Sequence, residues 1–463
     1  MKKQGQLKVG AARADITPDM GIQLAGDIGR YRPTEEIRDR LYVNVMVVES
    51  GTERFCWISA DLLASTTDWA DRIRRVLADR HDLDPARILF HVVQNHASPS
   101  LGHCFYQNET SYVPPELDWL KGGDERYNEP FLEQCVRAVG QAIKLMEPVT
   151  LHVGRGIDGR VAFNRRFVMR DGTARAHPSP CDPEILHAEG PVDPEVGVAT
   201  FVNRKGRTVA VLLHHTCHPC HGYPHRFVIG DWPGAWVERV RAKFGPGCVP
   251  MVINGCCGNI HHCNHIDPVV NHRTDYRDMA AKLMETTERV LGRVERFSDV
   301  TPGFARTKLS LPLRRLTPAV VRAAQDLLRK HPTPTWRDKS KTSVEWDWVY
   351  ATMIIDLKQT QKRTLSQDYE IQAFRIGDLS LVSLMGEPFV EAQLAIKRAS
   401  PTKYTMVAHF SNGYAGYVPT RLAFEGGGYE TNTSNGSKWD PSALERIEQA
   451  AVRLLKRACP GTK

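Results

Sequence analysis

Three segments of the chain repeat one pattern, and this repetition constrains the fold more than any other feature. Each segment has an apolar run, a polar cluster, a helix-like stretch, a second apolar run and a second polar cluster, and the three span 54–100, 207–265 and 379–420. Strands that alternate with helices predict parallel strand pairs in an α/β protein. Ligands bind beyond the carboxyl ends of such strands. Because His, Glu, Tyr and Asn residues follow these ends, the sequence predicts one shared site and indicates an enzyme.

The three segments together span most of the chain, so we expect one catalytic domain over residues 1–463. Hydrophobic residues make up 41% and charged residues 25%, as is typical of a globular protein. Helices are expected from about Ser65 to Arg80 and from about Glu129 to Leu145. A mainly helical insertion is expected at 317–364. The turn-rich stretch 161–193 predicts a long functional loop.

Charge and cysteine content narrow the choice of partners and compartment. The net charge of +8 is modest and the basic residues are scattered, which argues against nucleic-acid binding. No stretch approaches the roughly 18 apolar residues of a membrane helix, and no apolar run follows the first lysines, so we expect neither membrane insertion nor a signal peptide. Whether a leader peptide has been removed from the sequence stays open.

Eleven cysteines, an odd number, favour free thiols and a cytoplasmic location. We expect a small-molecule substrate; association into a homo-oligomer stays open.

Histidines are dense just after the first strand of the second segment. Two cysteines are interleaved with them, and the set is His214, His215, Cys217, His218, Cys220, His221 and His225. No second Cys-x-x-Cys pair follows at zinc-finger spacing, which disfavours a closed structural zinc site. A catalytic zinc uses a few His and carboxylate ligands and keeps one position open. His218 is the best candidate ligand, although a histidine in a loop is often merely solvated. We expect Cys217 and Cys220 not to bind the metal.

Further candidates lie in the first and third segments, and each has a simpler explanation. Glu387 follows an apolar strand and precedes a helix, where a carboxylate can cap backbone N–H groups. Tyr414 and Tyr417 could be core aromatics at a turn, and the residues around His96 could open a helix. Each signal is weak alone. Their matching placement in the repeated segments favours a functional site.

An ordered set of short motifs runs through the chain from about Lys8 to Glu430. The set comprises RADITP, NHASP, TCHP with GDWPG, GCCGNI, GEPF and GYAGYVPT, followed by Tyr429. Together these motifs resemble the neutral/alkaline non-lysosomal ceramidase family, whose members are zinc amidases that cleave the N-acyl bond of ceramide. The resemblance implies an α/β catalytic domain of two stacked mixed β-sheets flanked by helices. Because the sequence ends soon after Tyr429, we do not expect the immunoglobulin-like domain that follows in ceramidases.

The resemblance also implies a zinc site and substrate contacts. The family's zinc histidine, glutamate and tyrosine match His218, Glu387 and Tyr417. A second tyrosine that contacts substrate matches Tyr429, and an arginine that faces the substrate matches Arg165 in FNRRF. The resemblance thus predicts Zn²⁺ as the cofactor.

Two motifs depart from the ceramidase pattern. Where ceramidases have His-Thr-His-Ser, Gln94 matches the zinc histidine and His96 matches the second histidine. Because a neutral amide is a poor zinc ligand, we expect His96 to bind the metal. His261 and His262 replace a serine and a proline, so His261 is expected to act as general acid or base. These departures argue against ceramide as the substrate and favour a small polar or carbohydrate-like compound. Substrate contacts are also expected from Gln94, Asn259 and Arg166.

Three functions remain open. The leading one is a zinc-dependent hydrolase in which the oxyanion or an acidic group of the substrate is held by Arg165 and Tyr429. The first alternative is a metal-assisted lyase or glycosidase acting on a uronate-type carbohydrate, with Arg165 or Arg166 pairing the carboxylate. The second is a zinc-stabilised binding protein without catalysis. The expected zinc ligands are His96, His218, Glu387 and Tyr417.

Overall fold

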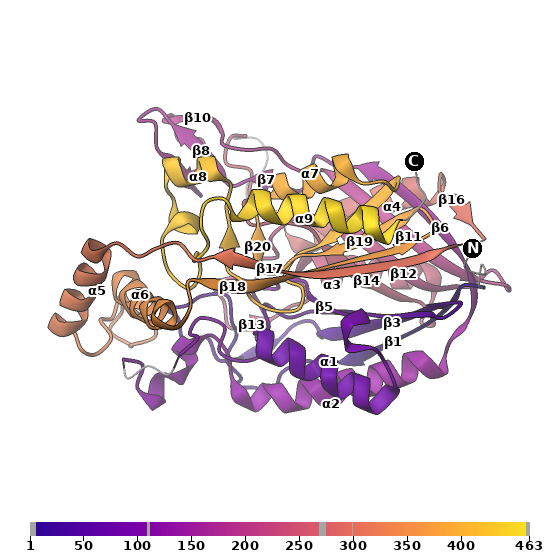
Figure 1. Ribbon diagram of the computed structural model, residues 1–463, viewed down its shortest axis with the longest axis horizontal. Coiled ribbons are helices and arrows are strands. Elements are labelled where there is room, and N and C mark those ends of the chain that lie inside the picture. Colours follow the sequence, from indigo (N-terminus) through magenta and orange to yellow (C-terminus); the bar gives the residue numbers. More distant parts are fainter. Residues whose placement is uncertain (1–5, 109–111, 268–274, 299, 460–463) are drawn as a thin grey trace.

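Two β-sheets lie face to face in this protein, and helices cover the outer face of each (Figure 1). The computed structural model describes residues 6–108, 112–267, 275–298 and 300–459. Apolar side chains from both sheets form one buried cluster, which includes Trp57, Phe201, Phe374 and Met406. Burying one large apolar side chain contributes about 1.5–3 kcal/mol, so this cluster holds the sheets together.

The larger sheet has nine strands. They are β1 (Lys8–Asp15), β3 (Tyr42–Ser50), β4 (Glu53–Ala60), β5 (Ile88–Val92), β6 (Glu147–Ile157), β11 (Glu195–Asn203), β12 (Thr208–His215), β14 (Val249–Asn254) and β16 (Glu295–Phe297). Their order is β14-β12-β11-β6-β1-β3-β4-β5, with β16 paired to β6. The central strands are antiparallel, whereas the end pairs β4–β5 and β12–β14 are parallel. Parallel neighbours need a crossover connection, which α1 (Thr67–His81) and α3 (Asp231–Phe244) provide.

The smaller sheet has four strands, and its order follows the sequence. They are β17 (Pro302–Pro312), β18 (Ser366–Ile376), β19 (Leu379–Ser383) and β21 (Tyr404–Ala408). The parallel pair β19–β21 is joined by α7 (Val390–Ala399). The three parallel pairs with their helices are the three repeated segments. The predicted α/β class with two stacked mixed sheets is therefore confirmed.

Helices pack on the outer sheet faces through their apolar sides. α2 (Glu125–Lys144) lies with α1 on one half of the larger sheet, and α4 (Tyr276–Leu291) lies with α3 on the other half. α9 (Ala443–Ala458) and α7 cover the smaller sheet, and the short α8 (Arg421–Gly426) precedes α9. α1 starts later than predicted because Thr66 caps it by accepting from the Trp69 N–H. None of the helices in the described ranges is long and apolar enough to cross a membrane.

Two stretches extend from this four-layered core. Residues 317–364 contain α5 (Pro318–Lys330) and α6 (Trp346–Arg363), which pack together at one end of the molecule (Figure 1). The insertion and the single domain over 1–463 stay predictions. The turn-rich stretch 161–193 is not a continuous loop, because β8 (Arg166–Met169), β9 (Ala174–Ala176) and β10 (Ile185–Ala188) form a small sheet. Its strands are short, so turn-forming residues dominate the sequence there.

Three short strand pairs join loops near the ends of the parallel strands. They are β2 (Glu36–Ile37) with β13 (Phe227–Val228), β7 (Phe163–Asn164) with β15 (Ile260–His261), and β20 (Glu387–Pro388) with β22 (Tyr417–Val418). The last two pairs contain predicted site residues. Backbone hydrogen bonds therefore fix the positions of these loops relative to one another.

Candidate metal and active site

Loops from all three segments meet beyond the carboxyl ends of the parallel strands. The His96 N–H, after β5, donates to the Pro219 carbonyl, after β12, at 2.9 Å. Glu387 in β20 lies directly opposite Tyr417 in β22. The structure thus contains the shared edge that the repeated segments predict.

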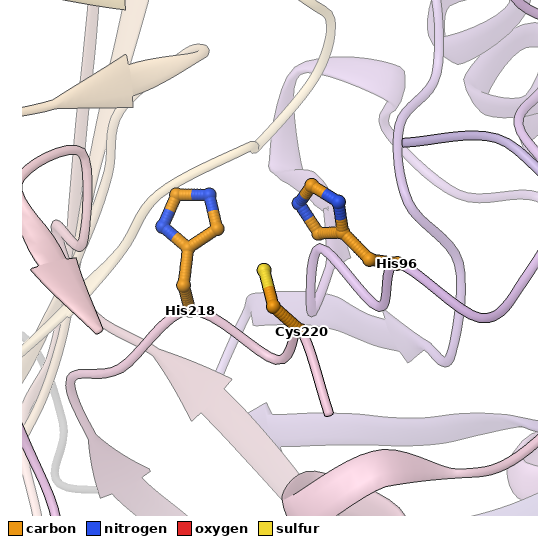
Figure 2. Close-up of side chains that lie close together, drawn as sticks. All are labelled: His96, His218 and Cys220. Atoms are coloured by element: carbon orange, nitrogen blue, oxygen red, sulfur yellow. The ribbon is translucent and has the colours of Figure 1, made fainter. Parts of the chain in front are cut away.

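The imidazoles of His96 and His218 lie close together (Figure 2), with ring centroids 5.3 Å apart. Nδ1 of His218 lies 2.8 Å from the Cys257 carbonyl oxygen, and Nδ1 of His96 lies 3.2 Å from that of Gly26. A carbonyl oxygen can only accept, so these bonds place the proton on Nδ1 and the lone pair on Nε2. Both Nε2 atoms are buried without a hydrogen-bond partner. A carbonyl that fixes one ring nitrogen while the other stays bare is typical of metal-binding histidines.

Both rings are neutral at neutral pH, which is the form that binds metals. Burial, aided by His218, lowers the pKa of His96 to about 3. Burial, followed by the charge of Arg165, lowers the pKa of His218 well below its ordinary value. Glu387 Oε2 lies 3.5 Å from His218 Nε2. A lone pair and a carboxylate oxygen at this separation attract a cation.

Gln94 holds Glu387 in place. Its Nε2 donates to Glu387 Oε2 at 2.7 Å, and its Oε1 accepts from the Cys257 thiol at 3.2 Å. Burial raises the pKa of Glu387, whereas Arg165 and hydrogen bonds from Tyr417 and Gln94 lower it. Because both ends of the Gln94 amide are bonded to protein, this side chain orients the carboxylate. Its predicted contact with substrate stays a prediction.

The Arg165 guanidinium is buried beside two tyrosines. Its Nη2 donates to Tyr417 Oη at 3.3 Å and to the Gly258 carbonyl at 2.7 Å, and its Nε donates to Glu430 Oε1 at 3.2 Å. Its Cζ lies 5.7 Å and 5.3 Å from the ring centroids of Tyr417 and Tyr429, within the range of a cation–π contact. Tyr429 is 37% exposed. The structure therefore connects Arg165 to Tyr417 inside the protein and to Tyr429 at its surface.

Arg166 and Asn259 have structural partners. The buried Arg166 guanidinium pairs with Glu189 and Glu430, and its Nη1 lies 2.7 Å from Glu430 Oε2. The Asn259 amide donates to Glu391 Oε2 at 3.1 Å and accepts from the first N–H of α7 at 2.9 Å. These bonds support the loops around the site and do not direct either group to the two histidines. Substrate binding by Arg166 and Asn259 stays a prediction.

His261 lies in β15 among other histidines. Its ring centroid is 4.2 Å from that of His262, 4.6 Å from that of His177 and 6.4 Å from that of His218. The Cys263 N–H donates to its Nδ1 at 3.2 Å, so a neutral ring carries its proton on Nε2. Burial, and next the proximity of His262, lower the pKa of His261 well below its ordinary value. His261 is therefore a neutral N–H donor at neutral pH.

Cys220 lies beside His96 and His218 (Figure 2). Its Sγ and one ring nitrogen of each histidine all lie within 4.8 Å of one another. Sequence analysis did not assign Cys220 to the site; its position two residues after His218 is the signal that could have indicated this placement. Two other buried residues that shape the site, Cys257 and Glu430, carry no local signal, because their partners lie far away in sequence.

The donors at this site fit zinc. Bare imidazole nitrogens, a thiol and a carboxylate are the groups that Zn²⁺ prefers. His96 and His218 are the residues that would hold the ion, and Glu387 adjoins them.

Comparisons with known proteins bear on the fold. No model of a protein family matches this chain, and no curated protein matches its sequence significantly. The solved structure of neutral ceramidase from Pseudomonas aeruginosa has a TM-score of 0.71 at 17% identity, over 98% of this chain and 74% of that chain. A ceramidase complexed with C2 has a TM-score of 0.72 at 15% identity, over 99% of this chain and 76% of that chain. The chain therefore has the neutral ceramidase fold that its motifs predict.

Proposed function

We propose that this protein is a zinc-dependent hydrolase that cleaves an amide or related bond in a small polar or sugar-like substrate. The observation that carries the proposal is the pair of buried, bare Nε2 atoms of His96 and His218. Each belongs to a neutral ring whose other nitrogen is fixed by a carbonyl. Two such nitrogens beside a carboxylate have few functions other than metal binding.

When bound, zinc would supply a water that is nucleophilic at neutral pH and would polarise a carbonyl group. His96 and His218 would hold the ion, with Glu387 and Tyr417 as the further ligands expected from the sequence. Gln94 keeps the Glu387 carboxylate turned toward His218 through its 2.7 Å hydrogen bond. The carbonyls of Gly26 and Cys257 keep both rings in the tautomer that presents Nε2.

The remaining side chains act on the substrate. Arg165 and Tyr429 lie together and supply donors for an oxyanion or an acidic group, and one well-placed donor lowers the barrier by roughly 3 kcal/mol. His261 contributes its Nε2–H, and its low pKa makes it a hydrogen-bond donor at the start of the reaction rather than an imidazolium acid. A leaving amine would then receive its proton from water.

The substrate class follows from the polar character of these groups. Arg165, His261 and Tyr429 offer hydrogen-bond donors, which suit an oxygen-rich acyl compound better than a long hydrocarbon chain. Both solved structures of this fold described above are ceramidases, so ceramide belongs in the test as a competing substrate. None of the eleven cysteines, all of which lie in the described ranges, is in a disulfide, which fits a reducing compartment such as the cytoplasm.

Metal analysis tests the cofactor. We expect about one zinc per purified chain, and we expect His218→Ala to lose it because one of the few ligands is gone. His225→Ala is the matched control, since His225 is exposed and stacks on Phe227. Metal-free wild-type protein that takes up no added zinc contradicts the proposal, and full zinc content in His218→Ala shows that another residue binds the ion.

A substrate panel tests the reaction. N-acyl sugars, short N-acyl amides, ceramide and uronate-containing oligosaccharides are assayed with and without a chelator. Chelator-sensitive release of an acid from an amide supports the proposal. Turnover of uronates alone favours the lyase or glycosidase alternative. Zinc retention without turnover of any member favours the non-catalytic binding protein.

A further inference from the structure

The turn that carries His218 also carries Cys220. The Cys220 N–H donates to the His218 carbonyl at 3.1 Å, and the Tyr223 N–H donates to the Cys220 carbonyl at 3.2 Å. This tight turn places residues 218 and 220 on one side of the loop. Figure 2 shows the Cys220 sulfur between the imidazoles of His218 and His96. This sulfur and one nitrogen of each ring lie within 4.8 Å of one another.

We propose that Cys220 is a thiolate ligand of the metal, together with His96 and His218. The inference deepens the proposed function, because it names a ligand of the same metal site. His218 is fully buried, its Nε2 has no hydrogen-bond partner, and one nitrogen of its ring belongs to the group of three ligand atoms. Three protein ligands and one open position form the arrangement of catalytic zinc sites. His96, His218 and Cys220 supply these three, so Cys220 takes the place that the sequence motifs give to Glu387 and Tyr417.

The neighbouring cysteines are engaged elsewhere. The Cys217 thiol lies 3.7 Å from the His218 carbonyl oxygen, and the Cys257 thiol donates to Gln94 at 3.2 Å. Cys220 is therefore the cysteine of this loop that the geometry assigns to the metal. The sequence-based expectation that neither cysteine of the loop binds the metal then holds only for Cys217.

Glu387 is the competing third ligand, and the two choices differ in chemistry. Glu387 Oε2 already accepts a hydrogen bond from Gln94. A thiolate gives the site a soft donor, which selects zinc over magnesium, manganese or calcium. Metal selectivity therefore follows from Cys220: zinc should displace manganese from the wild-type protein, and this preference should weaken in Cys220→Ser.

X-ray absorption at the zinc edge tests the ligand directly in the full-length, zinc-loaded protein. We expect a Zn–S distance of about 2.3 Å beside Zn–N distances of about 2.0–2.1 Å. Cys220→Ser should lose the sulfur signal, and its zinc affinity should fall by more than the roughly 10–100-fold loss that follows removal of an outer partner of a ligand. Cys217→Ser is the matched control and should keep both.

A second cluster requires its own control. His261, His262 and Cys263 also place ligand atoms within 4.8 Å of one another, so a sulfur signal could arise there. Cys263→Ser should keep the signal if Cys220 is the ligand. A signal that persists in Cys220→Ser and disappears in Cys263→Ser overturns the assignment.

The outcomes separate this inference from the proposed function. Wild-type protein that binds zinc with nitrogen and oxygen donors alone overturns the assignment of Cys220 and leaves the hydrolase proposal standing. Wild-type protein that binds no zinc overturns both. If Cys220→Ser fails to fold, Cys220→Ala and Cys263→Ser still decide, because a sulfur signal from Cys220 is lost in Cys220→Ala and kept in Cys263→Ser.

Discussion

Replacing Glu430 by glutamine removes a carboxylate that pairs with two buried arginines. Its Oε1 lies 3.2 Å from Arg165 Nε, and its Oε2 lies 2.7 Å from Arg166 Nη1. The side chains of Glu430, Arg165 and Arg166 are 0%, 2% and 0% exposed. After the change Arg166 still pairs with Glu189, whereas Arg165 has no carboxylate partner and keeps neutral acceptors such as the Gly258 carbonyl and the Tyr417 hydroxyl.

The loss of folding stability in Glu430→Gln can be estimated from this geometry. Breaking a buried ion pair by removing one partner destabilises a protein by about 3–5 kcal/mol, because an uncompensated buried charge remains. We expect that loss in the free energy of unfolding, measured from urea denaturation with the slope held constant. Glu445→Gln is the matched control: its pair with Arg421 is 3.1 Å long but half exposed, and such exposed pairs contribute little to stability.

Zinc content and catalytic efficiency distinguish a loss of stability in Glu430→Gln from a displacement of Arg165. Zinc content should be unchanged in Glu430→Gln, since Glu430 contacts the arginines and not the two histidines. The catalytic efficiency should fall, because a glutamine amide has one acceptor oxygen and cannot hold both Arg165 Nε and Arg166 Nη1 as the carboxylate does. If Glu430→Gln unfolds at the same urea concentration as Glu445→Gln, the two arginines do not depend on this carboxylate and the reasoning is wrong.

Three further predictions concern the site and the core. Arg165→Lys keeps the charge but loses the planar fork, so its kcat/KM should fall nearly as far as that of Arg165→Ala, with zinc retained in both. Gly26→Ala places a Cβ 2.6 Å from His96 Nδ1 at a φ of +101° and should weaken zinc binding by at least about tenfold, whereas Gly21→Ala, at +81° with open space around it, should not. Burial raises the pKa of Asp61 to about 7, so the folded protein favours the protonated carboxyl. Its contribution to stability is complete at low pH and is lost as pH rises through about 7. Asp61→Asn should therefore raise the urea midpoint more at about pH 8 than at about pH 5.

Local signals in the sequence predicted the three strand–helix–strand segments but not how they assemble. Each segment carries its own apolar runs and helix pattern, so its parallel pair could be expected. The first two segments lie at opposite ends of one sheet, and the third lies in the other sheet. That assignment depends on pairings such as β1 with β3 and β6, which join residues far apart in the sequence. The stacked arrangement was expected from the family resemblance alone.

The same limit explains which site residues could be anticipated. His218, Glu387 and Tyr417 follow strand ends, and the structure places them together. Arg165 and Arg166 are identical in type and adjacent in sequence, yet successive residues of an extended chain point to opposite sides. One guanidinium therefore contacts Tyr417 and the other Glu189. Only the position of the partners distinguishes the two, and those partners lie in distant segments.

The presence of Gln94 where ceramidases have a histidine is also explained by partners that lie far away in the sequence. In a strand, Gln94 and His96 would project to the same side, but Gln94 has a φ of 68°, an uncommon conformation for a residue with a side chain. At this bend an amide suits both neighbours, because it donates to Glu387 and accepts from the Cys257 thiol. A neutral imidazole presents one donor and one acceptor in a fixed plane and could not reach both groups in the same way. His96, two residues further on, then brings its bare Nε2 to His218, so the first segment still contributes a nitrogen donor to the site.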